Sequence, residues 1–107
     1  MFLTSHYKNC HAGFSALGER GKPAEQVAEE ACAALLRHHR SGAALEQHLA
    51  DQMILPAALC SDESTFSVEC ISQHLVTNAW VVERFGLAQV DILPAANGTG
   101  LVKIRGK

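Results

Sequence analysis

The stretch from residue 66 to residue 86, FSVECISQHLVTNAWVVERFG, changes its hydrophobic period halfway along, and this change restricts the fold more than any other feature. Phe66, Val68 and Cys70 alternate with other residues, which is the pattern of a half-buried strand. From His74 onward the apolar residues recur at helical spacing. A strand that passes into a helix within a few residues predicts a layered fold, because each element must bury its apolar face against another.

A first helix is expected over residues 23–40. Pro23 suits its first turn, where the missing N–H is not needed, and Gly42 suits its end. Basic residues in the last turn, His38 and His39 among them, match the helix dipole. Adjacent helix positions point about 100° apart, so we interpret the two histidines as C-terminal capping and not as a metal site.

A second helix is expected over residues 45–59, where Pro56 either kinks it or marks its last turn. The residues expected on its buried stripe are Leu45, Leu49 and Met53.

A third helix is expected over residues 73–85. Its expected inward residues are Leu75, Ala79, Val82 and either Phe85 or Gly86. After it, residues 87–93 and 101–105 both alternate and are separated by turn residues, which predicts a terminal antiparallel hairpin.

The other segments carry weaker signals. Residues 2–8 are compatible with a strand, while the glycine-containing residues 11–22 and the polar residues 60–64 are interpreted as loops. The expected order is strand, loop, helix, helix, strand, helix, strand, strand, which is an α+β pattern.

The composition fits a small globular protein. At 107 residues, with 48% hydrophobic and 19% charged residues, the chain can build one modest core. The formal net charge of −2 does not indicate a general attraction to nucleic acid. The short basic run of Lys103, Arg105 and Lys107 is interpreted as a solvated strand edge.

Neither a membrane span nor a secretory signal is expected, because no apolar run has the length or flanks that these segments need. The four cysteines contain no C-x-x-C pair. We interpret them as buried free thiols of a cytoplasmic protein.

His74 stands where the strand gives way to the helix. If Ser72 caps that helix, His74 lies in its first turn, beside unpaired backbone N–H groups that favour an anion and a neutral imidazole. Such an imidazole can attack phosphorus and form a phosphoramidate. The alternative is an ordinary first-turn histidine with a local hydrogen bond.

A second cluster is HLADQ, residues 48–52. His48 and Gln52 are four residues apart and share one helix face, with Asp51 beside them. A carboxylate, an amide and an imidazole on one face can bind the sugar and base of a nucleotide. The alternative is an ordinary polar helix face, and the spacing alone is too sparse for metal ligation.

Three blocks, GFSALGERGKPAE (13–25), HLADQMILPAAL (48–59) and HLVTNAWVVERF (74–85), together resemble the C-terminal part of the RNA 3′-terminal phosphate cyclase family. The likeness runs from about residue 9 to near the end of the chain. The family uses ATP and a divalent metal, Mg or Mn, to convert an RNA 3′-phosphate into a 2′,3′-cyclic phosphate through a histidine-bound AMP.

The resemblance assigns roles residue by residue. It implies that His74 is the adenylated nucleophile, and that the ATP-contacting block corresponds to His48, Leu49, Ala50, Asp51 and Gln52. No residue of this chain is assigned to the metal.

The resemblance also implies a partial fold and two domains. Residues 1–42 correspond to the end of an inserted α/β domain, and residues 43–107 to the last β-α-β-α-β-β-type repeat of the main domain. RNA 3′-phosphate ends are the expected substrate, and the missing N-terminal repeats would be needed in cis or in trans. The alternative is a truncated, non-catalytic α+β fragment or interaction module without turnover of its own.

Overall fold

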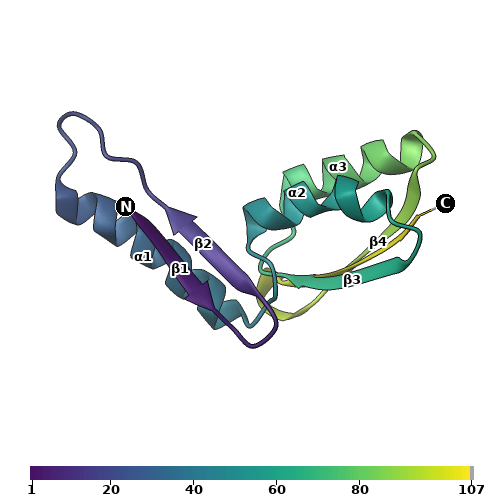
Figure 1. Ribbon diagram of the computed structural model, residues 1–107, viewed down its shortest axis with the longest axis horizontal. Coiled ribbons are helices and arrows are strands. Elements are labelled where there is room, and N and C mark those ends of the chain that lie inside the picture. Colours follow the sequence, from purple (N-terminus) through teal and green to yellow (C-terminus); the bar gives the residue numbers. More distant parts are fainter. Residues whose placement is uncertain (107) are drawn as a thin grey trace. The chain divides into compact units, whose positions relative to one another are not determined.

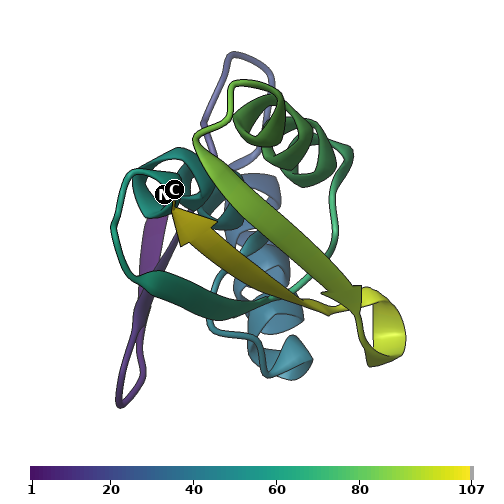
Figure 2. The same cartoon turned by 90° about the vertical axis from the view of Figure 1, so that its right-hand side faces the viewer.

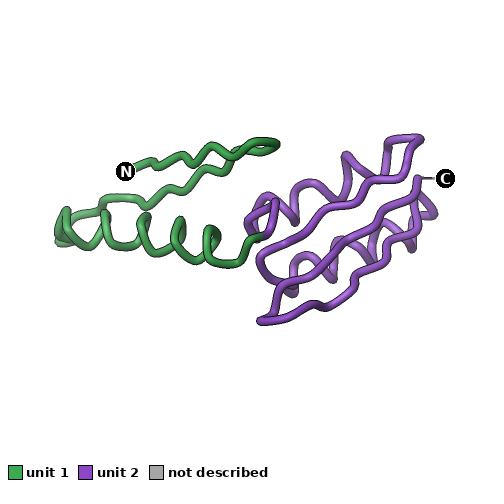
Figure 3. The backbone as a smooth tube through the Cα atoms, turned by 90° about the horizontal axis from the view of Figure 1, so that it is seen from below, with its two compact units in different colours: residues 1–42 green, residues 43–107 purple. Residues whose placement is uncertain are grey.

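The computed structural model describes residues 1–106 and has an α+β fold. It divides into two compact units, the first from Met1 to Gly42 and the second from Ala43 onward (Figure 3). The elements follow in the order β1, β2, α1 in the first unit and α2, β3, α3, β4, β5 in the second (Figure 1). The α+β class predicted from the sequence is therefore confirmed.

The first unit holds two antiparallel strands and one helix: β1 (Phe2–His6), β2 (His11–Ser15) and α1 (Ala24–Ser41). Along β2, Ala12 and Phe14 are buried and alternate with exposed residues. The loop expected over residues 11–22 is therefore wrong at its start, where β2 lies. Gly13 obscured the period of two, because it has no side chain to show which face it occupies. A side chain there would meet the ring of Phe2 at 2.9 Å.

The helix α1 begins after Pro23 and ends at Gly42, as the sequence predicts. Gly42 has φ 70°, a left-handed conformation that glycine adopts without strain. The helix buries Val27 and Ala31, which pack with Ala16.

His38 and His39, in the last turn of α1, differ from their predicted role. The ring of His38 is only 1% exposed and lies 5.6 Å from the ring of Phe14 and 6.1 Å from that of Tyr7, measured between centroids. The ring of His39 stacks on the ring of Tyr7. The capping interpretation is therefore wrong for His38, whose side chain packs inside the first unit.

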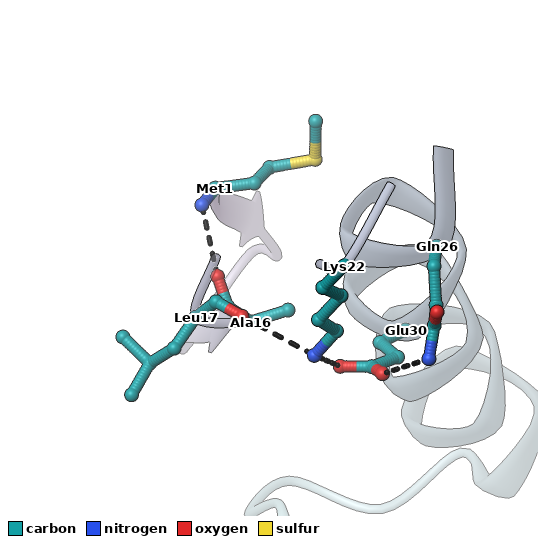
Figure 4. Close-up of polar contacts among 6 residues, drawn as sticks. All are labelled: Met1, Ala16, Leu17, Lys22, Gln26 and Glu30. Atoms are coloured by element: carbon teal, nitrogen blue, oxygen red, sulfur yellow. Dashed lines mark hydrogen bonds and ion pairs between the residues drawn. The ribbon is translucent and has the colours of Figure 1, made fainter. Parts of the chain in front are cut away.

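Lys22 connects the segment after β2 to α1 (Figure 4). Its Nζ donates to the carbonyl oxygen of Leu17 at 3.2 Å and pairs with Glu30 Oε2 at 2.8 Å. Gln26 Nε2 donates to the other carboxylate oxygen of Glu30 at 3.5 Å. The hydrogen bond from Lys22 is the main reason that the pKa of Glu30 lies below its usual value.

The second unit holds three strands and two helices: β3 (Glu63–Val68), β4 (Ala88–Pro94), β5 (Gly100–Gly106), α2 (Gln47–Ala58) and α3 (Gln73–Arg84). All neighbouring strands are antiparallel, in the order β3-β5-β4, so β5 is central. The two helices lie side by side over one face of this sheet (Figures 1 and 2). The three predicted helices and the predicted hairpin are confirmed, with ends that differ by two residues or less.

One backbone pairing precedes α2. Leu45 forms a parallel bridge with Val68, in which the Leu45 N–H donates to the Ser67 carbonyl at 3.1 Å and the Leu45 carbonyl accepts from the Glu69 N–H at 3.0 Å. With this single extended residue, the backbone order of the second unit is β-α-β-α-β-β. The partial fold expected from the resemblance has the same order.

The boundaries of β3 differ from the prediction. The strand begins at Glu63, inside the segment expected to be a polar loop, and ends at Val68. Glu63 pairs in register with Arg105 of β5, so the ladder extends into a sequence without apolar alternation. Pairing with a central strand, rather than local pattern, decides where this strand starts.

The core of the second unit lies between the helices and the sheet. On α3, Leu75, Ala79 and Val82 are buried as predicted, whereas Phe85 is 77% exposed. The stripe predicted for α2 is wrong, because Met53 is at the surface. The buried residues of α2 lie one position further along and are mostly small: Ala50, Ile54, Ala57 and Ala58. Leu45 was counted in the helical period, but it belongs to the bridge before the helix.

The basic run lies on the central strand and not on an edge, which corrects the prediction. Arg105 Nε is 3.5 Å from Glu63 Oε2, and another guanidinium nitrogen is 3.8 Å from Asp91 Oδ2. These exposed pairs lie on the open face of the sheet and contribute little to stability. Lys107 lies outside the described residues.

The cysteines also differ from expectation. Among the described residues none of the four forms a disulfide, but Cys32 and Cys60 are exposed, and Cys10 and Cys70 are partly exposed. The expectation of buried thiols is therefore wrong. Within residues 1–106, no helix combines the length and the apolar character that crossing a membrane requires.

Replacing Leu75 by alanine is expected to lower the free energy of unfolding of the second unit by about 2–5 kcal/mol, because this fully buried side chain would leave a cavity. Val76→Ala is the matched control, since Val76 is on the same helix and exposed. Denaturant titration followed by circular dichroism gives both values. Equal losses would contradict the burial of Leu75.

The pKa of Glu30, read from the NMR titration of its carboxyl carbon, is expected below the usual value and to rise when Lys22 is replaced by methionine. The unfolded chain lacks this contact, so its stabilising effect is present above the ordinary pKa of the carboxyl group. It is lost as the pH falls through the lower, folded-state value. The acid-induced loss of stability should therefore lessen in Lys22→Met. An unchanged Glu30 titration in that variant would contradict the contact.

Candidate functional site

Ser72 starts α3. Its backbone is extended, with φ −82° and ψ 161°, and its Oγ accepts a hydrogen bond from the Leu75 N–H at 3.1 Å. The predicted helix cap is therefore confirmed. His74 is in the first turn, and its side chain is exposed. Within the described residues, the imidazole makes no hydrogen bond. The local hydrogen bond of the alternative interpretation is therefore not seen there.

The starts of α2 and α3 differ in what satisfies their backbone N–H groups. In α2, the carboxylate of Glu46 accepts from the N–H groups of His48 and Leu49, and Glu69 Oε1 accepts from that of Gln47 at 3.0 Å. Two carboxylates therefore occupy this end, and they would repel a phosphate.

The start of α3 has a neutral cap instead. Ser72 satisfies the Leu75 N–H, while the N–H groups of Gln73 and His74 have no acceptor among residues 1–106. Free N–H groups and the positive end of the helix dipole favour an anion. Of the two helix starts in the second unit, that of α3 suits a phosphate, and it carries His74.

Asp51 joins the two blocks singled out in the sequence. Its Oδ1 accepts a hydrogen bond from Ser72 Oγ at 2.9 Å. Its backbone carbonyl accepts another from Asn78 Nδ2 at 3.2 Å. The HLADQ segment on α2 and the HLVTN segment at the start of α3 therefore meet at this residue.

A groove runs between α2 and α3. It has a volume of about 290 Å³, an apolar floor and three polar groups from Asp51, Gln52 and Asn78. The apolar lining residues are Ile54, Leu55, Val81 and Val82. Few, convergent polar groups over an apolar floor are typical of small-molecule sites.

The two candidate histidines are neighbours of this groove by helix geometry. His74 lies four residues before Asn78, and His48 lies four residues before Gln52. Residues at this spacing share a helix face about 5–6 Å apart. Each imidazole is therefore one turn from a residue that lines the groove, toward the start of its own helix.

The five HLADQ residues divide by exposure. His48 and Gln52 are exposed, while Asp51 and Leu49 are partly buried. Ala50 is fully buried in the core. Local sequence reasoning missed one residue, Asn78, and one contact, that from Ser72 to Asp51. Asn78 could have been found from its spacing to His74, whereas the Ser72 contact joins distant segments.

No metal site is formed by the part of the chain that the structure describes, where no three His, Cys, Asp or Glu side chains converge. The nearest approach of two histidines is in the first unit, where the Nδ1 atoms of His6 and His11 are 2.7 Å apart across β1 and β2. Residues 1–106 therefore do not by themselves supply a ligand set for a divalent ion.

Residues 4–92 match the model of a protein family described as RNA 3′-terminal phosphate cyclase. This range includes α2, α3 and the groove between them. The resemblance predicted from the sequence is confirmed by this match.

Similar curated proteins carry the same name. The chain is 71% identical to an RNA 3′-terminal phosphate cyclase of Methylococcus capsulatus, over 99% of this chain and 29% of that protein. It is 51% identical to one of Nostoc punctiforme, over 86% of this chain and 26% of that protein. It is 43% identical to one of Methanopyrus kandleri, over 87% of this chain and 26% of that protein. The chain therefore spans less than a third of the length of these relatives.

Replacing His74 by alanine is expected to change the free energy of unfolding by less than about 0.5 kcal/mol, because its exposed ring has no hydrogen-bond partner among residues 1–106. His38→Ala, by contrast, should cost about 1–3 kcal/mol, since it removes a buried ring that packs on Phe14. Thermal unfolding measured on both variants separates the two. A large loss in His74→Ala would indicate a structural role for that residue.

Proposed function

The chain belongs to the RNA 3′-terminal phosphate cyclase family, and we propose that it is the C-terminal portion of an ATP-dependent enzyme that converts an RNA 3′-phosphate into a 2′,3′-cyclic phosphate. In this proposal His74 is the nucleophile. The observation that carries it is the start of α3, where an exposed imidazole stands beside free N–H groups and one turn from the groove.

The proposed reaction has three steps. A ring nitrogen of His74 attacks the α-phosphorus of ATP, a P–N bond forms, and pyrophosphate leaves. An oxygen of the RNA 3′-phosphate then takes the AMP from the histidine, and the P–N bond breaks. Finally the neighbouring 2′-hydroxyl attacks the activated phosphorus, the ring closes, and AMP leaves. Each step is a nucleotidyl or phosphoryl transfer that requires accurate placement of the attacking atom.

The free N–H groups of Gln73 and His74 would contribute to the first step. Negative charge develops on the phosphoryl oxygens as the imidazole attacks. Fixed N–H donors at the positive end of α3 stabilise this charge without having to reorganise. The carboxylates at the start of α2 would disfavour the same phosphate there, so the phosphate is directed to α3.

The groove would hold part of the nucleotide. Its volume of about 290 Å³ is at the lower limit of ligand pockets, which are about 300–1,000 Å³. We therefore place the base and sugar over its apolar floor, within reach of Asp51 and Gln52, and the phosphates toward His74. His48 would lie at the rim, while Leu49 and Ala50 would shape the floor from within α2.

Groups outside this chain complete the proposed enzyme. ATP is the proposed nucleotide, and Mg or Mn the divalent ion, but the described residues do not supply a ligand set for the ion. The proposed remainder is the set of N-terminal repeats, supplied in cis or in trans. RNA 3′-phosphate ends are the proposed substrate, and the cytoplasm the proposed location.

The outer face of the helices gives such a remainder a place to pack. On α3, Trp80 is 61% exposed and Val76, one turn before it, is also exposed; Phe85, directly after the helix, is 77% exposed. Exposed apolar patches of this kind are typical of surfaces that another segment covers. The same observation favours the second candidate function, a non-catalytic α+β fragment or interaction module that associates without turnover.

Completing the chain with the upstream part of a family member should allow labelling of His74 by ATP that carries a radioactive α-phosphate. The adduct, a phosphoramidate, should be labile in acid and comparatively stable in alkali. His74→Ala should abolish the label, whereas His48→Ala should mainly raise the ATP concentration needed for half-maximal labelling. The chain alone should remain unlabelled, because the groups that orient the triphosphate are not all present.

Two outcomes would contradict this proposal in different ways. Label that survives His74→Ala in the completed protein would exclude His74 as the nucleophile. Efficient labelling of the 107-residue chain alone would show that no further segment is needed.

A further inference from the structure

We propose that Ser72 is a positioning residue for His74. Its hydroxyl group connects Asp51 on α2 to the first turn of α3, and this connection fixes the place of the imidazole beside the groove. The inference rests on the proposed function, because it concerns the reaction of the same histidine.

The hydroxyl group of Ser72 makes two hydrogen bonds with opposite roles. It donates to Asp51 Oδ1 at 2.9 Å and accepts from the Leu75 N–H at 3.1 Å. His74 lies between Ser72 and Leu75 in sequence, and Leu75 is 0% exposed in the core. The chain is therefore held two residues before His74 and one residue after it, while the His74 side chain is exposed.

The other end of this connection is on a well-anchored helix. The start of α2 is held by the carboxylates of Glu46 and Glu69. Ala50, next to Asp51, is fully buried. Because α2 also provides one wall of the groove, the bond to Ser72 places the start of α3 relative to that wall.

A second hydrogen bond to Asp51 holds α3 further along the helix. Asn78 Nδ2 donates to the backbone carbonyl of Asp51 at 3.2 Å. The two hydrogen bonds hold α3 before and after His74 in the sequence. The backbone that carries the imidazole therefore cannot shift along the groove without breaking one of them.

The two roles of the hydroxyl group can be separated by chemistry. A helix cap requires only an acceptor at position 72, which a carboxylate provides as well as a hydroxyl does. The bond to Asp51 requires a donor, which serine and threonine have and an ionised aspartate lacks. A variant that caps but cannot donate therefore tests the connection alone.

The first measurement is amide hydrogen exchange on the 107-residue chain itself. The variants are Ser72→Ala, which loses both bonds, Ser72→Thr, which keeps both, and Ser72→Asp, which keeps the cap. The double variant Ser72→Asp with Asp51→Asn reverses donor and acceptor. Ser61→Ala is the control, because Ser61 is exposed and outside this network.

Exchange of the Leu75 amide should be faster by roughly five- to tenfold in Ser72→Ala, as loss of a cap implies. Ser72→Asp should also exchange faster, since two carboxylates would face each other. Ser72→Thr and the double variant should regain the protection of the unchanged chain. If Ser72→Asp is as protected as the unchanged chain, Ser72 is only a local cap and the inference is wrong.

The second measurement is adenylation in the completed protein. Ser72→Ala should slow the formation of the His74 adduct by roughly ten- to a hundredfold, as misplacement of a nucleophile implies. The ATP concentration at half-maximal rate should change by less than about twofold, because the groove residues are kept. Ser72→Thr should restore the rate. Parallel changes in both quantities, or no rescue by threonine, would contradict a positioning role.

The two proposals fail in distinguishable ways. If the unchanged completed protein forms no adduct, the proposed function is wrong, and the positioning role falls with it. If the adduct forms normally in Ser72→Ala while exchange at Leu75 is faster, His74 is still the nucleophile and only the positioning role is refuted.

Discussion

Burial of apolar side chains between two helices and one face of a three-stranded sheet is the constraint on which the second unit depends. The fully buried residues come from both layers: Val68, Val102 and Ile104 from the sheet, and Leu75 from the helices. Because β5 is central, it contacts both flanking strands as well as α2, while α3 packs on β4. When α2 and α3 both pack on this face, they lie beside each other, and the groove forms between them. The polar contacts at Asp51 then select one register from those that the core permits.

Electrostatics distinguishes the two helix starts that the core brings together. The first N–H groups of each helix have no acceptor within the helix. In α2, carboxylates accept from them, whereas in α3 a hydroxyl group does. The two carboxylates accept directly from the N–H groups of α2, whereas the carboxylate of Asp51 reaches the start of α3 only through the Ser72 hydroxyl. The residues at the cap positions, more than the helices themselves, therefore set the local charge at these two helix starts.

The sequence allowed the helices to be predicted because their signals are local. Pro23, Gly42 and Ser72 mark ends, and the stripe of Leu75, Ala79 and Val82 repeats at helical spacing. The errors came from effects that are not local. β2 is defined by its pairing with β1, and Leu45 belongs to a bridge with a residue far along the chain. In the candidate site, His74 and the HLADQ segment could be identified from the sequence, but the bond from Ser72 to Asp51 could not, because it exists only after α2 and α3 have packed.

The two outer strands of the sheet, β3 and β4, are protected in different ways from pairing with strands of other molecules. The free side of β3 is occupied at Val68 by the parallel bridge to Leu45. β4 ends in Pro94, which has no N–H to offer, and carries Asp91 in its middle. Proline and charge on an edge strand discourage the pairing of sheets from separate molecules. A unit with this much exposed apolar helix surface is therefore expected to associate less readily through the edges of its sheet than through its helices.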